Sequence, residues 1–146
     1  MSDVYELQLH LNLTASTPAD TLSRLRRHLG AEPWPDEVAD DGPLLASRGP
    51  AARIGGVLVG ELAESPHGWS LTARQEIHPD QFQDLHFLLK RLAAHTGVPG
   101  SIGQLRFLED HVPDLIVPTD DGEVARLPLT APAPGAAVPF LEDLGW

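Results

Sequence analysis

The residues best suited to chemistry lie on one side of an alternating stretch near the start of the chain. Residues 4–13 have the sequence VYELQLHLNL, in which polar and apolar side chains alternate without a break. This alternation predicts a strand with one face on a core and the other face away from it. Carboxylate and imidazole groups on one face could shuttle a proton or bind a polar ligand. The polar face consists of Glu6, Gln8, His10 and Asn12.

Three further charged residues are expected beside this polar face. Arg74 and Glu76 belong to a second alternating stretch, and Arg106 belongs to a stretch in which we expect Leu105 and Phe107 to point inward. Together with the polar face they would form a carboxylate, imidazole and guanidinium cluster for a small ligand. The simpler interpretation is the solvated side of a sheet, where cross-strand Arg–Glu pairs are ordinary. We favour it, because a binding site needs something that makes the face concave. No residue is therefore assigned as catalytic.

The sequence lacks the usual motifs for metals, cofactors and nucleic acids. It has no cysteine, and its seven histidines show no HxH, HxxxH or HExxH spacing. Gly55, Gly56 and Gly60 are not a dinucleotide fingerprint, because no helix follows them to present its N-terminus to a phosphate. They indicate a bend or a close approach of the backbone instead. The open face also lacks the aromatic residues of an RNA-binding sheet. We expect no metal, no cofactor and no nucleic-acid partner.

The order of the predicted elements indicates an α+β domain. The expected main strands are at 4–13, 53–61, 69–77 and 102–108. One helix is capped by Thr17 and ends at Gly30, and a second runs from His78 to Gly97. The remaining elements are a short edge strand at 44–47 and an extra edge hairpin at 115–117 and 124–127. The β-α-β-β-α-β order resembles the ferredoxin-like class. It implies a four-stranded antiparallel sheet, ordered fourth, first, third, second, with both helices on one face. That class has many unrelated functions, so it predicts no activity.

The second predicted strand, 53–61, has apolar residues on both faces. Leu58 belongs to one face, and Val57 and Val59 belong to the other. A strand that is apolar on both sides needs a cover on each side. The helices would cover one side, and the second cover would be the loop at 31–52, the C-terminal tail or a second subunit. We therefore expect a homodimer.

Two apolar features lie outside the predicted core. Trp34 stands between two prolines in the 31–52 loop, and we expect it to pin that loop to the domain or to act as a lid. Residues 1–130 are expected to form the domain, and 131–146 a Pro/Ala-rich extended tail. Burial of a large apolar side chain is worth about 1.5–3 kcal/mol, so the end of the tail should dock on its own domain, a neighbouring subunit or a partner. Its apolar residues are Phe140, Leu141, Leu144 and Trp146.

The chain is acidic, with 21 Asp and Glu residues against 10 Lys and Arg residues and a net charge of −11. The acids concentrate in residues 31–52 and in the last 41 residues, which argues against a phosphate-backbone partner. One lysine against nine arginines is a bacterial-type composition typical of GC-rich coding sequences. The N-terminus has no signal-peptide pattern, and no apolar run reaches membrane-spanning length. A soluble cytoplasmic protein without a membrane partner is expected.

These observations favour a non-catalytic binding or assembly domain that self-associates as a homodimer. The first alternative is a small-molecule enzyme or ligand-binding protein that uses the polar cluster on the open sheet face. The second alternative is an acidic adaptor or inhibitor of a basic protein, which would act through residues 31–52 and the tail.

Overall fold

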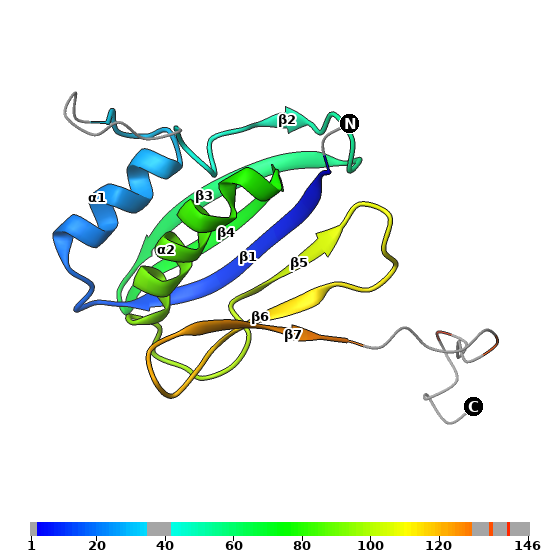
Figure 1. Ribbon diagram of the computed structural model, residues 1–146. Coiled ribbons are helices and arrows are strands. Elements are labelled where there is room, and N and C mark those ends of the chain that lie inside the picture. Colours follow the sequence, from blue (N-terminus) through cyan, green and yellow to red (C-terminus); the bar gives the residue numbers. More distant parts are fainter. Residues whose placement is uncertain (1–2, 35–41, 130–134, 136–139, 141–146) are drawn as a thin grey trace.

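A seven-stranded antiparallel sheet forms the body of the protein, in the order β2-β3-β4-β1-β5-β6-β7 (Figure 1). The computed structural model describes residues 3–34, 42–129, 135 and 140. The strands are β1 (Tyr5–Thr14), β2 (Gly49–Pro50), β3 (Val57–Ser65), β4 (Gly68–Ile77), β5 (Gly103–Phe107), β6 (Asp114–Pro118) and β7 (Val124–Pro128). The helices are α1 (Ala19–His28) and α2 (Phe82–Ala93), and the 3-10 turn η1 (Pro79–Gln81) precedes α2. β1 lies in the middle of the sheet, between β4 and β5.

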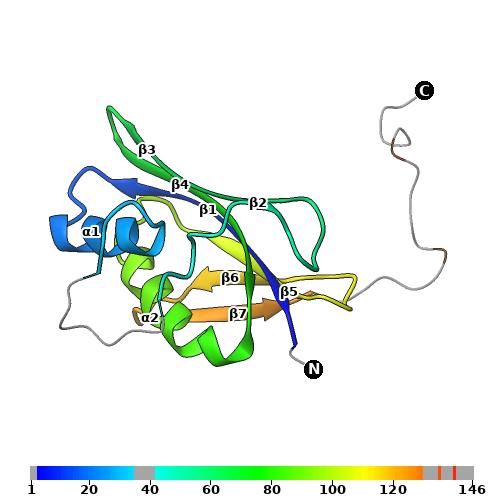
Figure 2. The ribbon, with the colours of Figure 1, turned by 90° about the horizontal axis from the view of Figure 1, so that it is seen from above.

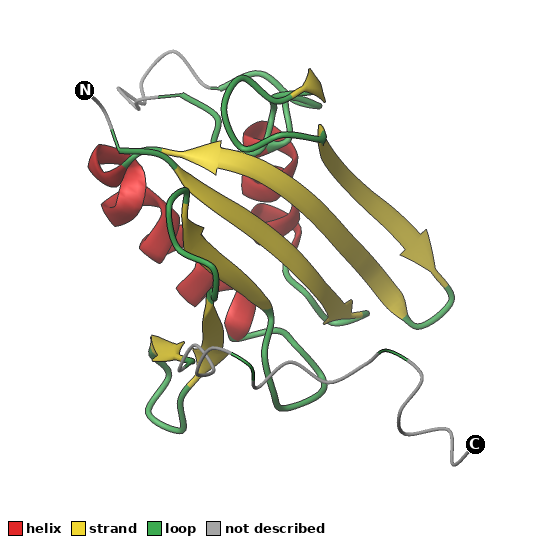
Figure 3. Cartoon of the chain, turned by 90° about the vertical axis from the view of Figure 1, so that its right-hand side faces the viewer, coloured by secondary structure: helices red, strands yellow, loops and turns green. Residues whose placement is uncertain are grey.

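The apolar side of β1 forms the centre of the core. Leu7, Leu9 and Leu13 are almost fully buried, and both helices lie on this side of the sheet (Figure 3). Each fully buried leucine contributes about 1.5–3 kcal/mol relative to an exposed one. The alternation therefore directs the polar residues of β1 to the opposite, open face, and His10 and Asn12 are exposed there.

Local hydrogen bonds fix where the two helices begin. Pro18, rather than the predicted Thr17, occupies the N-cap position of α1. The reason is that the Thr17 hydroxyl donates to the Thr14 carbonyl at 2.7 Å and closes the turn between β1 and α1. Before α2, the backbone N–H of His78 donates to the Gln81 side chain at 2.8 Å, which satisfies one donor at the start of the 3-10 turn.

The prediction of a ferredoxin-like sandwich with a four-stranded sheet is wrong. The predicted appended hairpin is part of the sheet, because β6 pairs with β5 and places Ile116 opposite Gly103. Ile116 is buried in the same core as the β1 leucines, so its burial favours a continuous sheet over a separate hairpin. β7 then follows β6 and contacts α2 (Figure 2). The order of the four central strands, β3-β4-β1-β5, and the position of both helices on one side of the sheet agree with the expectation.

The second predicted strand also begins too early. Residues 53–56 form a loop, and β3 starts only at Val57. Gly55 and Gly56 have φ angles of 77° and 67°, which lie in the left-handed region and interrupt an extended strand. The short edge strand expected at 44–47 is absent from the described residues, where β2 pairs with the start of β3 instead.

Candidate functional site

The sheet register brings most of the predicted polar residues together on the open face. Glu6 lies opposite Glu76 on β4 and opposite Arg106 on β5. Gln8, two residues further along β1, lies opposite Arg74 on β4. Directly opposed residues in a sheet project from the same face and can interact. The predicted facing of these strands is therefore confirmed.

Glu6 lies at the centre of the charged residues on this face. Its Oε2 accepts hydrogen bonds from Arg74 Nε at 2.8 Å and Gln8 Nε2 at 3.2 Å, and its Oε1 accepts one from Arg106 Nε at 3.1 Å. We call Glu6, Gln8, Arg74 and Arg106 the Glu6 cluster. Burial disfavours the charged carboxylate, but the bonds from Gln8 and both arginines outweigh it and lower the pKa of Glu6. Glu6 is thus an ionised partner of two arginines rather than a proton carrier.

The arginines of the Glu6 cluster use their remaining donors on two loops. Arg74 Nη1 donates to the carbonyl of Gly55 at 2.7 Å, which holds the loop that precedes β3. Arg106 Nη1 donates to the carbonyls of Leu108 at 3.1 Å and Asp110 at 2.9 Å, which holds the loop after β5. A guanidinium group offers five N–H donors in a fixed plane, so one side chain can bind a carboxylate and a loop together.

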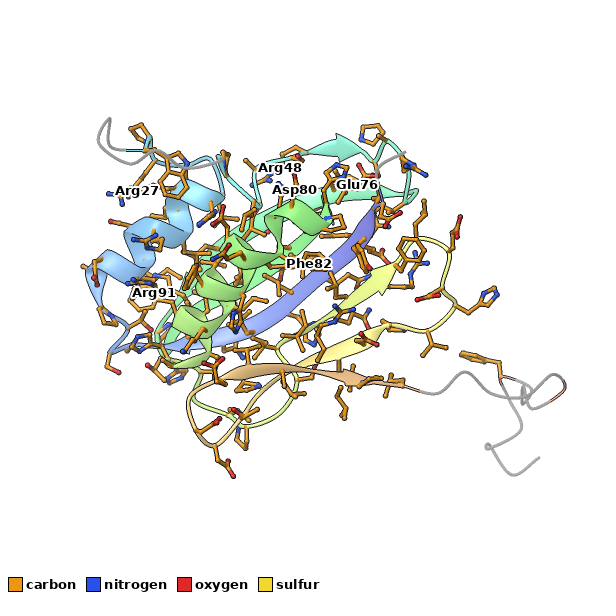
Figure 4. All side chains as sticks on the ribbon, viewed as in Figure 1. Arg27, Arg48, Glu76, Asp80, Phe82 and Arg91 are labelled. Atoms are coloured by element: carbon orange, nitrogen blue, oxygen red, sulfur yellow. The ribbon has the colours of Figure 1, made fainter. Side chains whose placement is uncertain are left out.

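The Glu76 carboxylate holds the same loop before β3 by accepting hydrogen bonds from the loop's backbone N–H groups. Its Oε2 accepts from Arg53 at 2.7 Å and Ile54 at 3.1 Å, and its Oε1 accepts from Ala52 at 3.1 Å. Burial opposes ionisation, but these three backbone bonds prevail and lower the pKa of Glu76. In Figure 4, Glu76 is labelled at the end of the sheet where this loop turns. The Glu76 carboxylate is therefore the negatively charged acceptor that satisfies three backbone donors of this loop.

The other half of the polar face has a different environment. His10 and Asn12 are exposed, and Asn12 Oδ1 accepts a hydrogen bond from the Ser70 hydroxyl at 2.7 Å. A cavity of about 200 Å³ lies beside them, with Thr96 and Ser101 in its wall. The structure therefore separates the predicted site into a bonded half and an open half. His10 does not join the Glu6 cluster.

The geometry gives the Glu6 cluster no free group for acid–base chemistry. Both oxygens of Glu6 are engaged, and so are both oxygens of Glu76. Within residues 3–34 and 42–129, no group of three or more His, Asp or Glu side chains could hold a metal ion. The same part of the chain contains no helix long and apolar enough to cross a membrane.

No family model, curated protein or solved structure matches this chain.

The predicted docking residues are described only in part. The Trp34 ring contacts the buried His28 ring edge-on, with centroids 4.9 Å apart, and so lies against the end of α1. Phe140 is 97% exposed. Leu141, Leu144 and Trp146 lie outside the described residues. The role of these residues in docking stays a prediction.

Sequence reasoning missed two polar residues that hold the 42–50 segment. Gln75 is 1% exposed on the core side of β4, and its amide donates to the carbonyls of Ser47 at 3.0 Å and Val59 at 2.9 Å. Arg48 donates to the carbonyl of Gly60 at 2.8 Å. The sequence contains one signal for Gln75, because it is a polar residue on the apolar side of an alternating strand.

Proposed function

We propose that the protein is a non-catalytic assembly domain that pairs with a second copy of itself through the open face of the sheet. The observation that supports this most is the second side of β3. Val57 is 57% exposed and Val59 is 39% exposed on the open face, whereas Leu58 between them is 6% exposed on the core face. Neighbouring exposed apolar residues on a sheet are typical of an interaction surface.

The described part of the 31–52 loop does not cover these valines. Leu44 and Leu45 are buried in the core below the sheet, and β2 pairs along the outer edge of β3. Two of the three expected covers therefore remain, the tail and a second subunit. A second subunit is favoured because apolar residues stand at both margins of the open face, on either side of the polar residues Arg74, Gln8 and Gln104. Along one row of opposed residues, Val59 stands at one margin and Leu115 and Leu127 stand at the other.

The charge of this face also favours contact between identical copies. A two-fold interface brings the same patch together twice, so a strongly acidic patch would repel itself. The chain has a net charge of −11, whereas the central strands present a nearly balanced set on the open face. That set is Glu6, Glu61 and Glu76 against Arg74 and Arg106.

The test is the oligomeric state of the full chain. We expect a concentration-dependent dimer in sedimentation velocity, and Val59→Glu should weaken the dimer by about a hundredfold, since it removes apolar burial and adds a like charge. Phe87→Glu is the matched control, because Phe87 is 62% exposed on α2, away from the open face. A wild-type monomer at every concentration would overturn the proposal. Equal loss of dimer in both variants would place the interface elsewhere.

The two alternatives have less support from the side chains. The Glu6 cluster is bonded internally, so an acid–base enzyme would have to use the exposed His10, which lines the cavity of about 200 Å³. The acidic adaptor would use residues 31–52 and the tail, and residues 35–41 and most of the tail lie outside the described residues. Both stay predictions.

A further inference from the structure

A second cavity, of about 190 Å³, lies on the opposite side of the sheet from the proposed interface. It is formed between α2 and the last three strands, and Figure 4 marks Phe82 where α2 overlies the sheet. Most of its wall is apolar, from Phe82, Leu85, Leu89, Leu105, Ile116 and Val124. An apolar cavity of about 150 Å³ stays dry and is large enough to bind benzene. This cavity is therefore large enough for one substituted ring.

Arg126 is one of two polar side chains in the wall, the other being His86. Its guanidinium lies over the rings of Tyr5 and Phe82, with its central carbon 5.9 and 5.8 Å from their centroids. Its Nε and Nη2 both bind Asp114 Oδ2, at 3.0 and 2.8 Å. Nη1 has no hydrogen bond to any part of the chain that the structure describes. A guanidinium that Asp114 holds, on a side chain that is 46% exposed, thus borders an apolar space with one spare donor.

The neighbouring charges decide which ligand suits that donor. Asp114 already neutralises Arg126, and Glu123 binds both Lys90 at 2.6 Å and His86 at 3.1 Å. A carboxylate ligand would add a negative charge near Asp114 without a cation of its own, and it would lose part of its hydration beside the apolar wall. A neutral acceptor oxygen can take the Nη1 donor without that cost.

We propose that this cavity binds a small neutral ring compound with one carbonyl-type acceptor oxygen. The ring fills the apolar space between α2 and the β5–β7 strands, and the oxygen accepts a hydrogen bond from Arg126 Nη1. The volume of the cavity determines the size of the ligand, which is one ring. The Asp114–Arg126 ion pair favours an acceptor group without charge.

The first test compares three probes with the wild-type chain by amide NMR titration. Acetophenone has a ring and a carbonyl, toluene has the ring alone, and benzoate has a charged carboxylate. A ligand with so few atoms should bind with a dissociation constant of roughly millimolar. We expect acetophenone to bind about tenfold more tightly than the other two, as one hydrogen bond to a charged donor allows. The shifts should concentrate on α2 and β7. Equal affinities, tighter binding of benzoate, or no saturable shifts would overturn the proposal.

The second test fills the cavity. Val124→Phe places a ring in the space and should abolish acetophenone binding, whereas Leu129→Phe changes an exposed residue just after β7 that does not line the cavity and should leave binding unchanged. Arg126→Met should reduce acetophenone to the affinity of toluene. If Val124→Phe binds acetophenone as well as the wild type, the site is not this cavity. The ranking of probes on the unmodified chain decides the question even if a variant fails to fold.

Discussion

The two halves of the polar face of β1 follow one sequence pattern and have opposite environments. Glu6 is 8% exposed and is bonded to two arginines, whereas His10, four residues away on the same face, is exposed. The difference comes from the connections at each end of the strand. At the Glu6 end, residues 51–56 and 107–110 fold over the face. At the other end, β3 and β4 meet in a tight hairpin that leaves the face open.

This comparison shows that alternation determines the face of a residue but not its exposure. Arginine and glutamate bind backbone groups at several positions, so a strand end that contains them can hold loops. The loop beside His10 and Asn12, which contains Thr96 and Ser101, lines a cavity with them and makes no hydrogen bond to either side chain among the described residues. The charged half of the face therefore contributes mainly to stability, and the neutral half contributes little.

Removal of Glu6 is expected to have the largest effect. Glu6→Ala leaves two half-buried arginines without their carboxylate, and loss of one member of a buried charge pair is costly. We expect a loss of about 2–4 kcal/mol in the free energy of unfolding, below the full buried value because both arginines are partly exposed. Urea denaturation at pH 7 measures it.

Glu61→Ala is the matched control for this substitution. Glu61 lies on the same face and is exposed, and its side chain has no hydrogen bond or ion pair to any described residue. Its loss should change stability by about 0.5 kcal/mol or less. If the two variants are equally stable, the Glu6 cluster does not hold the loops.

Glu76→Gln should have an intermediate effect that depends on pH. The pKa of Glu76 is lowered in the folded chain, so its contribution is present above the ordinary value of 4.5 and is lost as the pH falls through the folded value. At pH 7 we expect a cost of about 1–2 kcal/mol, because three backbone donors lose a charged acceptor. As the pH falls from 4.5 through the lower pKa of the folded chain, the wild type and the variant should converge, because the wild-type carboxylate becomes protonated.

Urea denaturation across pH 3–7 measures this convergence, and hydrogen exchange at Arg53 and Ile54 reports the loop directly. The exchange of these two amides should accelerate in the variant at pH 7, while buried amides of β1 stay protected. A pH-independent difference between wild type and variant would mean that the charge of Glu76 does not hold the loop.

The faces of the central strands could be predicted from the sequence, because period-two patterns depend only on local geometry. The size of the sheet could not. Asp114–Pro118 is a short apolar segment, and its pairing with β5 depends on a core in which Ile116 finds space. The start of β3 was misplaced because the apolar pattern continues through two glycines whose positive φ angles break the strand.

The members of the candidate site were predicted, but their environment was not. The sequence places Glu6, Arg74 and Arg106 on one face, and the register confirms it. Whether these side chains bind a ligand or the protein's own loops depends on the loop conformations, which no periodic sequence pattern predicts. Arg126 and its cavity were missed for a related reason, since both depend on the packing of α2 against a strand that was assigned to an appended hairpin.

The smallest effect is expected at the open half of the face. Asn12→Ala removes one exposed hydrogen bond to Ser70, and His10→Ala removes an exposed ring. Water replaces both interactions, so each variant should lose about 0.5 kcal/mol or less in urea denaturation. The substitutions lie on the same strand and face as Glu6→Ala, but they remove exposed side chains that pair with no arginine. A cost at Asn12 as large as that at Glu6 would show that strand position, rather than the loops over the face, determines the energetic difference between the two halves.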